Sequence, residues 1–471
     1  MTPTKQGSSR MRLALSLAAV LVASGCHVLD VATPDIVPGD NLNDPNALPT
    51  IRAGAIGDFG IAYSGSGAQG SNGTTEGQVL ISGMLGDELI NTETFPDRVF
   101  TDARQPQPES GTLTTIFRNL HRARHSAEGA AARFRALSDT TTNGGLSEML
   151  SLAGYTYVFF AENYCSGVPV STVNADGSFS FGAPLTTSQL LDTALNRFGQ
   201  ALTAANALGA GVATKVSLQS LARVGIGRAL VDKGDFTGGD TAVAAVLTSF
   251  AYLIQHDLNT TRQNDGVYAG IRRYKRYGVP DREGLSGLPY RSVVDPRTPS
   301  FRLSATNKGF DGVTPQFDQD RYTDEKASVT LATGAEARLI QAEAALHVPN
   351  VAGMMTILNA LRTAPPAYFL TGNGPGVAGP IAPMAAMGTP AGTVDGADSL
   401  FYERAHWLWL TAHRLSDERR LERQYARADS TVFPHGAYFK NGLLYGTAVN
   451  LPIPTDELNN PNFAACIDRL P

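Results

Sequence analysis

The sequence 403-ERAHWLWLTAHRLSDERR-420 decides which fold we expect for this chain. Its charged residues recur at i, i+3 and i+4 spacing, which makes opposite charges neighbours on a helix surface. The charged set comprises Glu403, Arg404, Arg414, Asp417 and Arg420, and two tryptophans lie within the same stretch. We therefore expect helical structure in which ion pairs surround a buried aromatic face, with a structural role rather than a ligand contact.

A second C-terminal segment, 451-LPIPTDELNNPN-462, cannot begin as a helix. Pro452 and Pro454 each lack a backbone donor, and each restricts the residue before it to extended conformations. The chain should therefore close with an extended stretch.

Apolar periodicity predicts helices over much of the remaining chain. The expected helices are 48–63, 114–137, 146–163, 188–208, 218–233, 241–253, 336–347 and 351–362. The helix 146–163 is apolar on most faces, which indicates a position deep in the core. The segments 188–253 and 336–362 form helix pairs of tetratricopeptide-like spacing, in which a small residue such as Gly227 lets the next helix pack closely. Ordinary helical hairpins would give the same pattern.

Four stretches lack this periodicity and are rich in residues that favour turns. They are 64–75, 171–187, 260–330 and 364–398. Long loops in a compact protein are usually functional or disordered. We therefore expect a helical scaffold that carries a loop-built surface.

The C-terminal motifs resemble those of the SusD/RagB family of outer-membrane nutrient-uptake lipoproteins. Members of that family typically end with an acidic helix of the form E-R-x-x-E-L-x-x-E-G-x-R-x-x-D-L and a P-I-P-x-x-E-x-x-x-N-P close. The segments 29-LDV-31, 342-AEA-344 and 358-LNALR-362 extend the likeness across the mature chain, whereas His406 and the stretch 410–413 depart from the acidic helix. The resemblance implies a mainly α-helical, tetratricopeptide-like scaffold with long irregular loops.

The N-terminus has the three regions of a bacterial lipoprotein export signal. Basic residues at 5, 10 and 12 precede the apolar run 13–22, and small residues at 23–25 precede Cys26. The apolar run is too short to remain as a membrane span, which needs about 20 residues. We expect residues 1–25 to be removed, Cys26 to be lipidated, residues 26–49 to form a tether and residues 50–471 to form the ligand-binding body. The alternative is an ordinary secretory signal with a buried or disulfide-bonded Cys26.

Composition excludes some partners. The chain is 42% hydrophobic and 17% charged, which describes a globular protein. Loss of the three basic residues in 1–25 changes the formal net charge from −5 to −8, which argues against a nucleic-acid partner. Cys165 and Cys466 remain as an even pair in an exported chain, so we expect a disulfide between them, with two free buried thiols as the alternative.

Aromatic residues in the irregular segment are the candidate ligand contacts. Tyr268, Tyr274, Tyr277 and Tyr290 alternate with arginines and a lysine, and Phe95 offers a second patch on an earlier loop. Flat side chains beside donors can stack on sugar rings and hydrogen-bond to them. The basic neighbours also permit an acidic oligosaccharide or a peptide carboxylate. The alternative is that these aromatic residues fill the core beneath the loops.

Catalytic chemistry is not evident. The adjacent Asp87 and Glu88 would point apart, and we expect a solvated acidic pair rather than half of a glycosidase site. His121 and His125 share a helix face among arginines, and we expect solvent exposure rather than zinc binding. No nucleotide-binding or serine-hydrolase fingerprint is present. We expect no catalytic residue, metal or cofactor.

The resemblance implies a lipid-anchored protein of the outer membrane, exposed at the cell surface. It would capture an oligomeric nutrient, a glycan or a peptide, and pass it to a SusC-like TonB-dependent β-barrel transporter, over whose mouth the body would close as a lid. The alternatives are an exported helical-repeat scaffold without a small-molecule ligand, and a degenerate glycan-active enzyme.

Overall fold

The computed structural model describes residues 43–68, 76–174, 176–372 and 378–471. The chain divides into two units, Met1–Ala47 and Leu48–Pro471. Only residues 43–47 of the first unit are described, and they contain the 3₁₀ turn η3 (Pro45–Ala47). The predicted signal peptide, Cys26 and most of the predicted tether therefore lie outside the described residues.

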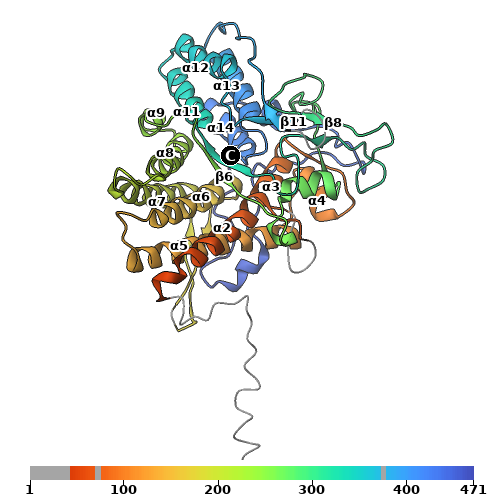
Figure 1. Ribbon diagram of the computed structural model, residues 1–471. Coiled ribbons are helices and arrows are strands. Elements are labelled where there is room, and N and C mark those ends of the chain that lie inside the picture. The colour runs from red at the N-terminus through yellow and green to blue at the C-terminus, as the bar shows by residue number, and fades with distance from the viewer. Residues whose placement is uncertain (1–42, 69–75, 175, 373–377) are drawn as a thin grey trace, which may run out of the picture. The chain divides into compact units, whose positions relative to one another are not determined.

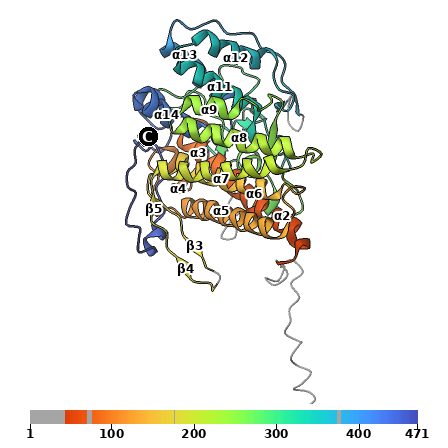
Figure 2. The same ribbon diagram turned by 90° about the vertical axis from the view of Figure 1, so that its left-hand side faces the viewer.

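The second unit is built mainly from helices that pack in sequence order (Figure 1 and Figure 2). The first series is α2 (Leu48–Ser64), α5 (Gly111–Leu137), α6 (Gly145–Asn163), α7 (Thr187–Ala207), α8 (Lys215–Asp232) and α9 (Phe236–Val243). Next, α11 (Gly334–His347) packs against α8 and α9, and α12 (Val351–Thr363) and α13 (Thr393–Trp407) follow it. A mainly α-helical scaffold of paired helices is confirmed.

The centre of this scaffold is α6, in which every residue is buried, as the sequence predicted. Close packing between the helices of one pair depends on a glycine. A Cβ atom at Gly227 of α8 would lie 2.5 Å from Cγ1 of Val243 in α9, so a larger residue there would force the two helices apart.

The C-terminal motif forms a buried charge network between α13 and α14 (Arg414–Tyr425). Arg404 contacts Asp417 at 2.8 Å, and Arg420 pairs with Asp417 and with Glu343 of α11. Burial acts to raise the pKa of Asp417, but the Arg404 and Arg420 guanidiniums outweigh it and hold that pKa below its ordinary value. The expected structural role of this motif is confirmed.

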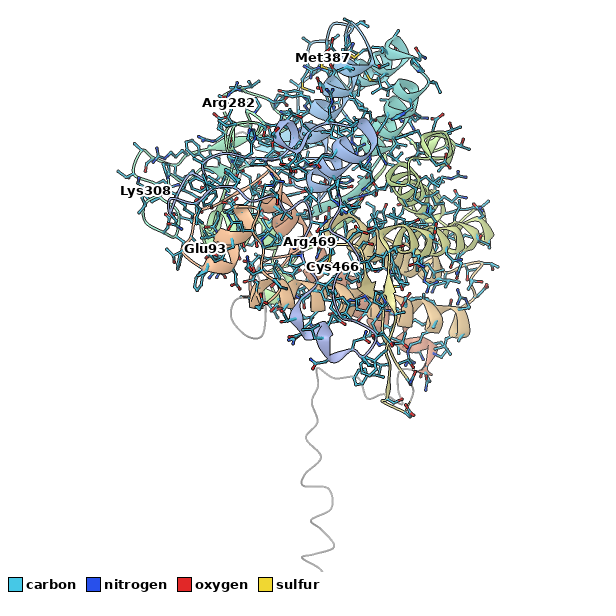
Figure 3. All side chains as sticks on the ribbon, turned by 180° about the vertical axis from the view of Figure 1, so that it is seen from behind. Glu93, Arg282, Lys308, Met387, Cys466 and Arg469 are labelled. Atoms are coloured by element: carbon cyan, nitrogen blue, oxygen red, sulfur yellow. A yellow bond between two sulfur atoms is a disulfide. The ribbon has the colours of Figure 1, made fainter. Side chains whose placement is uncertain are left out.

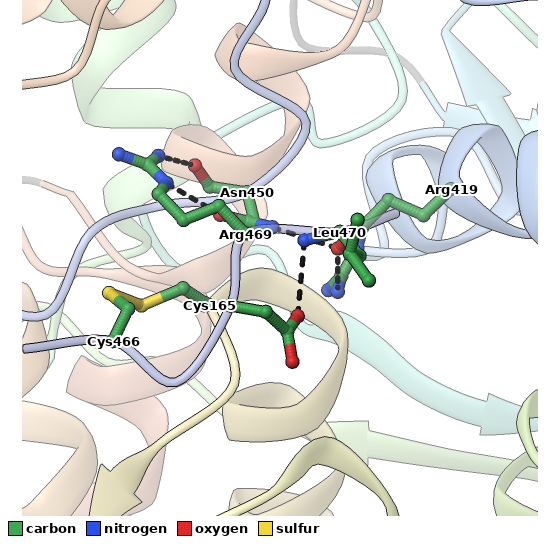
Figure 4. The surroundings of a disulfide bond; sticks show 7 residues. Cys165, Arg419, Asn450, Cys466, Arg469 and Leu470 are labelled. Atoms are coloured by element: carbon green, nitrogen blue, oxygen red, sulfur yellow. Dashed lines mark hydrogen bonds between the residues drawn. A yellow bond between two sulfur atoms is a disulfide. The ribbon is translucent and has the colours of Figure 1, made fainter.

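The extended close of the chain is also buried. Residues 451–454 lie in the core, Leu451 bridges to Tyr164 at the end of α6, and the 3₁₀ helix η6 (Thr455–Asn459) follows. The chain then returns to Cys466, which the structure joins to Cys165 with the two Cα atoms 6.0 Å apart (Figure 4). That separation lies within the usual range for a disulfide. Arg469 and Leu470 contact Asn450, so hydrogen bonds fasten the tail as well.

Strands are short, and all six described pairs are antiparallel. They are β1 (Ile90–Asn91) with β7 (Tyr277–Gly278), β2 (Val168–Pro169) with β5 (Pro184–Leu185), β3 (Thr172–Val173) with β4 (Phe179–Ser180), β6 (Ala251–Ile254) with β10 (Val329–Thr333), β8 (Ser300–Phe301) with β9 (Asp318–Gln319), and β11 (Leu370–Gly372) with β12 (Ala378–Pro380). The expected helix 241–253 is wrong, because α9 ends at Val243 and Ala251–Ile254 is a strand. Its pairing with β10, far along the chain, decides its conformation.

The other helical elements are short. They are α3 (Gln78–Leu85), α4 (Pro96–Asp102), η4 (Thr261–Gln263), α10 (Gly266–Tyr268), the π-helical turn η5 (Ala269–Arg273) and α15 (Asp429–Val432). Within the described ranges, no helix has both the length and the apolar character that crossing a bilayer requires.

Candidate ligand-binding site

Three loops far apart in sequence meet at one edge of the body, beside the β1–β7 pair. Backbone hydrogen bonds join them: the Thr92 N–H donates to the Arg276 carbonyl at 2.9 Å, and the Phe310 N–H donates to the Lys275 carbonyl at 2.8 Å. The loops approach so closely that a Cβ atom at Gly309 would lie 2.4 Å from Cβ of Thr92. Glycine at this position lets the third loop reach the other two.

The three loops present an aromatic cluster with an arginine at its centre. The rings of Phe95 and Phe310 lie 6.3 Å apart at 28°, and these side chains are 46% and 55% exposed. The guanidinium carbon of Arg276 is 5.8 Å from the Phe95 ring centre and 5.7 Å from those of Tyr274 and Phe310. We call these four residues the aromatic platform. Exposed phenyl rings in mutual contact make this cluster a candidate binding site.

Buried carboxylates support the platform from beneath. Glu93 is buried; its Oε1 lies 3.0 Å from Nη1 of Arg98 and its Oε2 lies 3.5 Å from Nε of Arg276. Burial raises the pKa of Glu93 by more than the two arginines lower it. Glu76, also buried, accepts hydrogen bonds from Arg98 at 2.6 Å and from the Tyr277 hydroxyl at 2.5 Å. These contacts fix the arginines on which the exposed rings rest. Figure 3 labels Glu93 and Lys308 at this loop-rich edge, away from Cys466 and Arg469.

The five aromatic residues that the sequence singled out have different environments. Phe95 and Tyr274 belong to the platform, and the Tyr274 hydroxyl donates to the Gly67 carbonyl at 2.6 Å. Tyr268 is half-buried and lies 5.1 Å from the Arg272 guanidinium. Tyr277 and Tyr290 are enclosed: Tyr277 lies beneath the platform, and Tyr290 packs between His406 and Trp409 in the core. A direct ligand contact by these last two side chains is therefore not supported, because no face of either ring is free.

Sequence reasoning missed Phe310. It lies in a polar loop between Gly309 and Gly312, with no apolar periodicity around it. A large aromatic side chain flanked by glycines in such a loop has few core neighbours available, and that pattern is the signal that would have found it.

Two other sequence expectations are corrected. Asp87 and Glu88 are fully buried rather than solvated, because Arg414 pairs with Asp87 and the Leu410 N–H donates to Glu88. Burial raises the pKa of Glu88 to about 8. His121 is half-buried rather than exposed.

The His121 ring lies 4.6 Å from Phe117 and 4.4 Å from Phe160, and burial lowers its pKa to about 3. Among the described residues, no group of three His, Cys, Asp or Glu side chains could hold a metal.

Two surface hollows lie away from the platform. One, of about 410 Å³, lies between the ends of α11 and α14 and the start of α13, and His347, Tyr425 and Arg427 are among the residues that line it. The other, of about 330 Å³, lies between α5 and the β3–β4 hairpin, where Phe117, His121 and Phe179 contribute to its walls. Neither contains a residue of the aromatic platform.

Comparisons with known proteins identify the fold. A scan against protein-family models and a search of curated proteins find no match. Among solved structures, the surface glycan-binding protein A from Bacteroides uniformis matches with a TM-score of 0.61 at 12% identity, over 89% of this chain and 99% of that one. A SusD superfamily protein from Bacteroides vulgatus matches with a TM-score of 0.59 at 13% identity, over 90% and 99% of the two chains.

A SusD-like carbohydrate-binding protein from Bacteroides fragilis gives a TM-score of 0.60 at 13% identity, over 90% and 99% of the two chains. The body is thus a helical scaffold with an aromatic surface site borne on loops. It has the SusD-like fold, and the fold that the C-terminal motifs predicted is confirmed.

Proposed function

We propose that this chain is a cell-surface lipoprotein of the SusD/RagB family that captures an oligosaccharide and delivers it to a SusC-like TonB-dependent transporter in the outer membrane. The aromatic platform is the observation that carries the proposal. The exposed rings of Phe95 and Phe310 can stack on the faces of sugar rings, and the arginines beside them can donate hydrogen bonds to hydroxyl groups.

The fold supports a glycan over a peptide as the ligand. Structures with the same fold include a surface glycan-binding protein and a carbohydrate-binding protein by their own descriptions. A rigid helical body that carries its ligand contacts on loops is a common arrangement for binding proteins. Capture by stacking also requires no catalytic group, which agrees with a binding protein rather than an enzyme.

The export signal supports the proposed anchor, and the resemblance of the C-terminal motifs to the family supports the proposed partner. The export signal before Cys26 supports lipid attachment, with residues 26–49 as a tether for the body. A tethered body can stay beside a membrane transporter while it releases ligand into it. We propose that the body closes over the mouth of the transporter as a lid.

Two measurements test this function. The full-length chain with a C-terminal tag should co-purify with a large β-barrel protein from detergent-extracted outer membranes, and its Cys26→Ser variant should lose membrane attachment. Isothermal titration against a panel of oligosaccharides and peptides should give binding to a glycan without release of shorter products. A chain that binds no glycan and no transporter would be a helical scaffold, and one that shortens its ligand would be an enzyme.

A further inference from the structure

The segment that contains most of the platform has a charge opposite to that of the whole chain. Residues 260–310 contain ten Arg and Lys but only four Asp and Glu, whereas the chain has a formal net charge of −5. A cluster of one sign on a surface raises the local concentration of oppositely charged ligands. Several of these arginines pair with carboxylates outside the segment, such as Arg272 with Asp320 and Arg273 with Glu325, so the cations beside the platform are the ones that bear on a ligand.

Arg276 is the group best placed to bind that anion. Three aromatic rings hold its guanidinium, and 13% of the side chain is exposed. Among the described residues, no hydrogen-bond acceptor is found for its side chain, and the nearest carboxylate oxygen is the Glu93 Oε2 at 3.5 Å from Nε. A guanidinium is a planar fork of donors that matches the two oxygens of a carboxylate.

Two lysines beside Arg276 add positive charge, although the buried carboxylate of Asp318 offsets part of the charge of Lys275. Nζ of Lys275 donates to the side-chain oxygen of Asn307 at 2.9 Å, and Nζ of Lys308 donates to the Val313 carbonyl at 2.9 Å. A neutral acceptor does not itself cancel the charge of the ammonium that donates to it. Lys308 is exposed next to Phe310, so it can approach a ligand that stacks on that ring.

The acidic groups of the same region do not cancel this arrangement. Glu93 and Glu76 are buried beneath the platform and contact Arg98 and Arg276, while Glu325 pairs with Arg273 at 3.0 Å. Asp311, next to Phe310, has a side chain that is 8% exposed and lies 3.5 Å from the ammonium of Lys440. The buried carboxylates offset part of the arginine charge without presenting a negative surface to a ligand. The outward-facing groups of the platform are therefore aromatic rings and cations.

From these observations we propose that the platform selects acidic oligosaccharides, in which sugar rings bear carboxylates. This inference rests on the proposed glycan-binding function and names the class of ligand. A pyranose ring stacks on Phe95 or Phe310 while its carboxylate accepts hydrogen bonds from Arg276, with Lys275 and Lys308 supplying longer-range attraction. The aromatic faces supply affinity for any sugar, and the cations supply selectivity for the acidic ones.

Pairs of ligands that differ only in the charge of their carboxyl groups separate the aromatic contribution to affinity from the contribution of the cations. We would titrate the mature chain in mild detergent with oligogalacturonate, oligomannuronate and glucuronate-containing oligosaccharides, each beside its methyl-esterified form of the same length. The acidic form should bind at least about tenfold more tightly in 50 mM salt, and the difference should shrink in 500 mM salt because screening weakens exposed charge interactions. Equal or tighter binding of every esterified form would overturn the inference while leaving glycan binding intact.

Other outcomes of the titration are equally decisive. Binding of a sulfated but otherwise neutral oligosaccharide in preference to all uronates would overturn the assignment of carboxylate recognition. Binding of acidic peptides with no glycan, or of no ligand at all, would overturn the proposed function as well.

Single substitutions test which side chains give the platform its preference for acidic ligands. Arg276→Gln and Lys308→Gln should each weaken binding of the acidic ligand by at least about threefold more than binding of the esterified ligand. Phe95→Ala should weaken both forms alike. Lys308 is exposed, so its variant tests the inference even if Arg276→Gln lowers stability. Arg118→Gln, a distant and exposed change, is the control and should leave the preference at the wild-type value.

Discussion

Arg414 in α14 and Asp87, 327 residues earlier in the chain, form a buried two-point ion pair. Nε lies 2.5 Å from Oδ1 and Nη2 lies 3.0 Å from Oδ2 of the carboxylate. Oδ2 of Asp87 also accepts a hydrogen bond from the Leu288 N–H at 2.7 Å. One carboxylate thus connects α14, the segment between α3 and β1, and the irregular segment that carries most of the platform.

Replacing Asp87 by Asn should lower the free energy of unfolding by about 3 to 5 kcal/mol, because it leaves a buried guanidinium without its main counter-charge. Urea denaturation of the two proteins measures the difference. Arg118 pairs with Asp456 on the surface, so Arg118→Ala should cost less than about 1 kcal/mol. If both variants lower the free energy of unfolding by the same amount, the buried ion pair stabilises the protein no more than the surface pair does.

The C-terminal motif and most helix bounds could be predicted because they depend on local patterns. Helix 351–362 was expected and α12 is Val351–Thr363; helix 146–163 was expected and α6 is Gly145–Asn163. Apolar period and charge spacing are properties of neighbouring residues, so they are visible in one sequence. The strand Ala251–Ile254 was missed because its partner β10 lies about eighty residues further along the chain.

The candidate site was only partly predictable for the same reason. Aromatic residues among arginines indicated the right segment, but which of them face solvent depends on contacts between three distant loops. Tyr277 is buried because Ile90–Asn91 pairs with its strand and Glu76 accepts a hydrogen bond from its hydroxyl. Phe310 faces outward because Gly309 lets its loop approach Thr92. Neither relationship is a local pattern.

The buried Glu88 should make stability depend on pH in a defined window. Its pKa is raised from an ordinary 4.5 to about 8, chiefly by burial, so folding favours the protonated carboxyl. The stabilising effect of that proton is complete below pH 4.5 and is lost as pH rises from 4.5 to about 8. Within this window the free energy of unfolding should fall by about 1.4 kcal/mol for each pH unit because of this group.

The variant Glu88→Gln isolates this effect, since its side chain keeps an oxygen for the Leu410 N–H and stays neutral at every pH. The difference in unfolding free energy between wild type and variant should decrease steadily from pH 5 to pH 8 and then level off. Denaturation series at four or five pH values give that curve. A flat difference would mean that Glu88 is ionised in the folded protein throughout.

The link between Cys165 and Cys466 should contribute to stability through its long loop. The two cysteines are 301 residues apart, and in the chain-entropy model closing so long a loop raises the free energy of the unfolded state by roughly 5 kcal/mol. Cys466→Ser should lower the melting temperature under oxidising conditions, and the wild type should lose a similar amount on reduction. Peptide mapping without reductant checks the premise, because two alkylatable thiols in the native protein would contradict it.

Phe95 and Tyr277 should give opposite results in paired measurements of affinity and stability. The Phe95 ring is 46% exposed on the platform, so Phe95→Ala should weaken glycan binding by about 1 to 2 kcal/mol and change the free energy of unfolding by less than about 0.5 kcal/mol. Tyr277 is fully buried and its hydroxyl donates to Glu76 at 2.5 Å. Its replacement by Ala opens a cavity and removes that hydrogen bond, which should cost about 3 to 5 kcal/mol of stability. Titration calorimetry and urea denaturation on the same preparations measure both quantities. If Phe95→Ala unfolds as easily as Tyr277→Ala, or binds ligand as tightly as wild type, then the exposed rings do not form the binding surface.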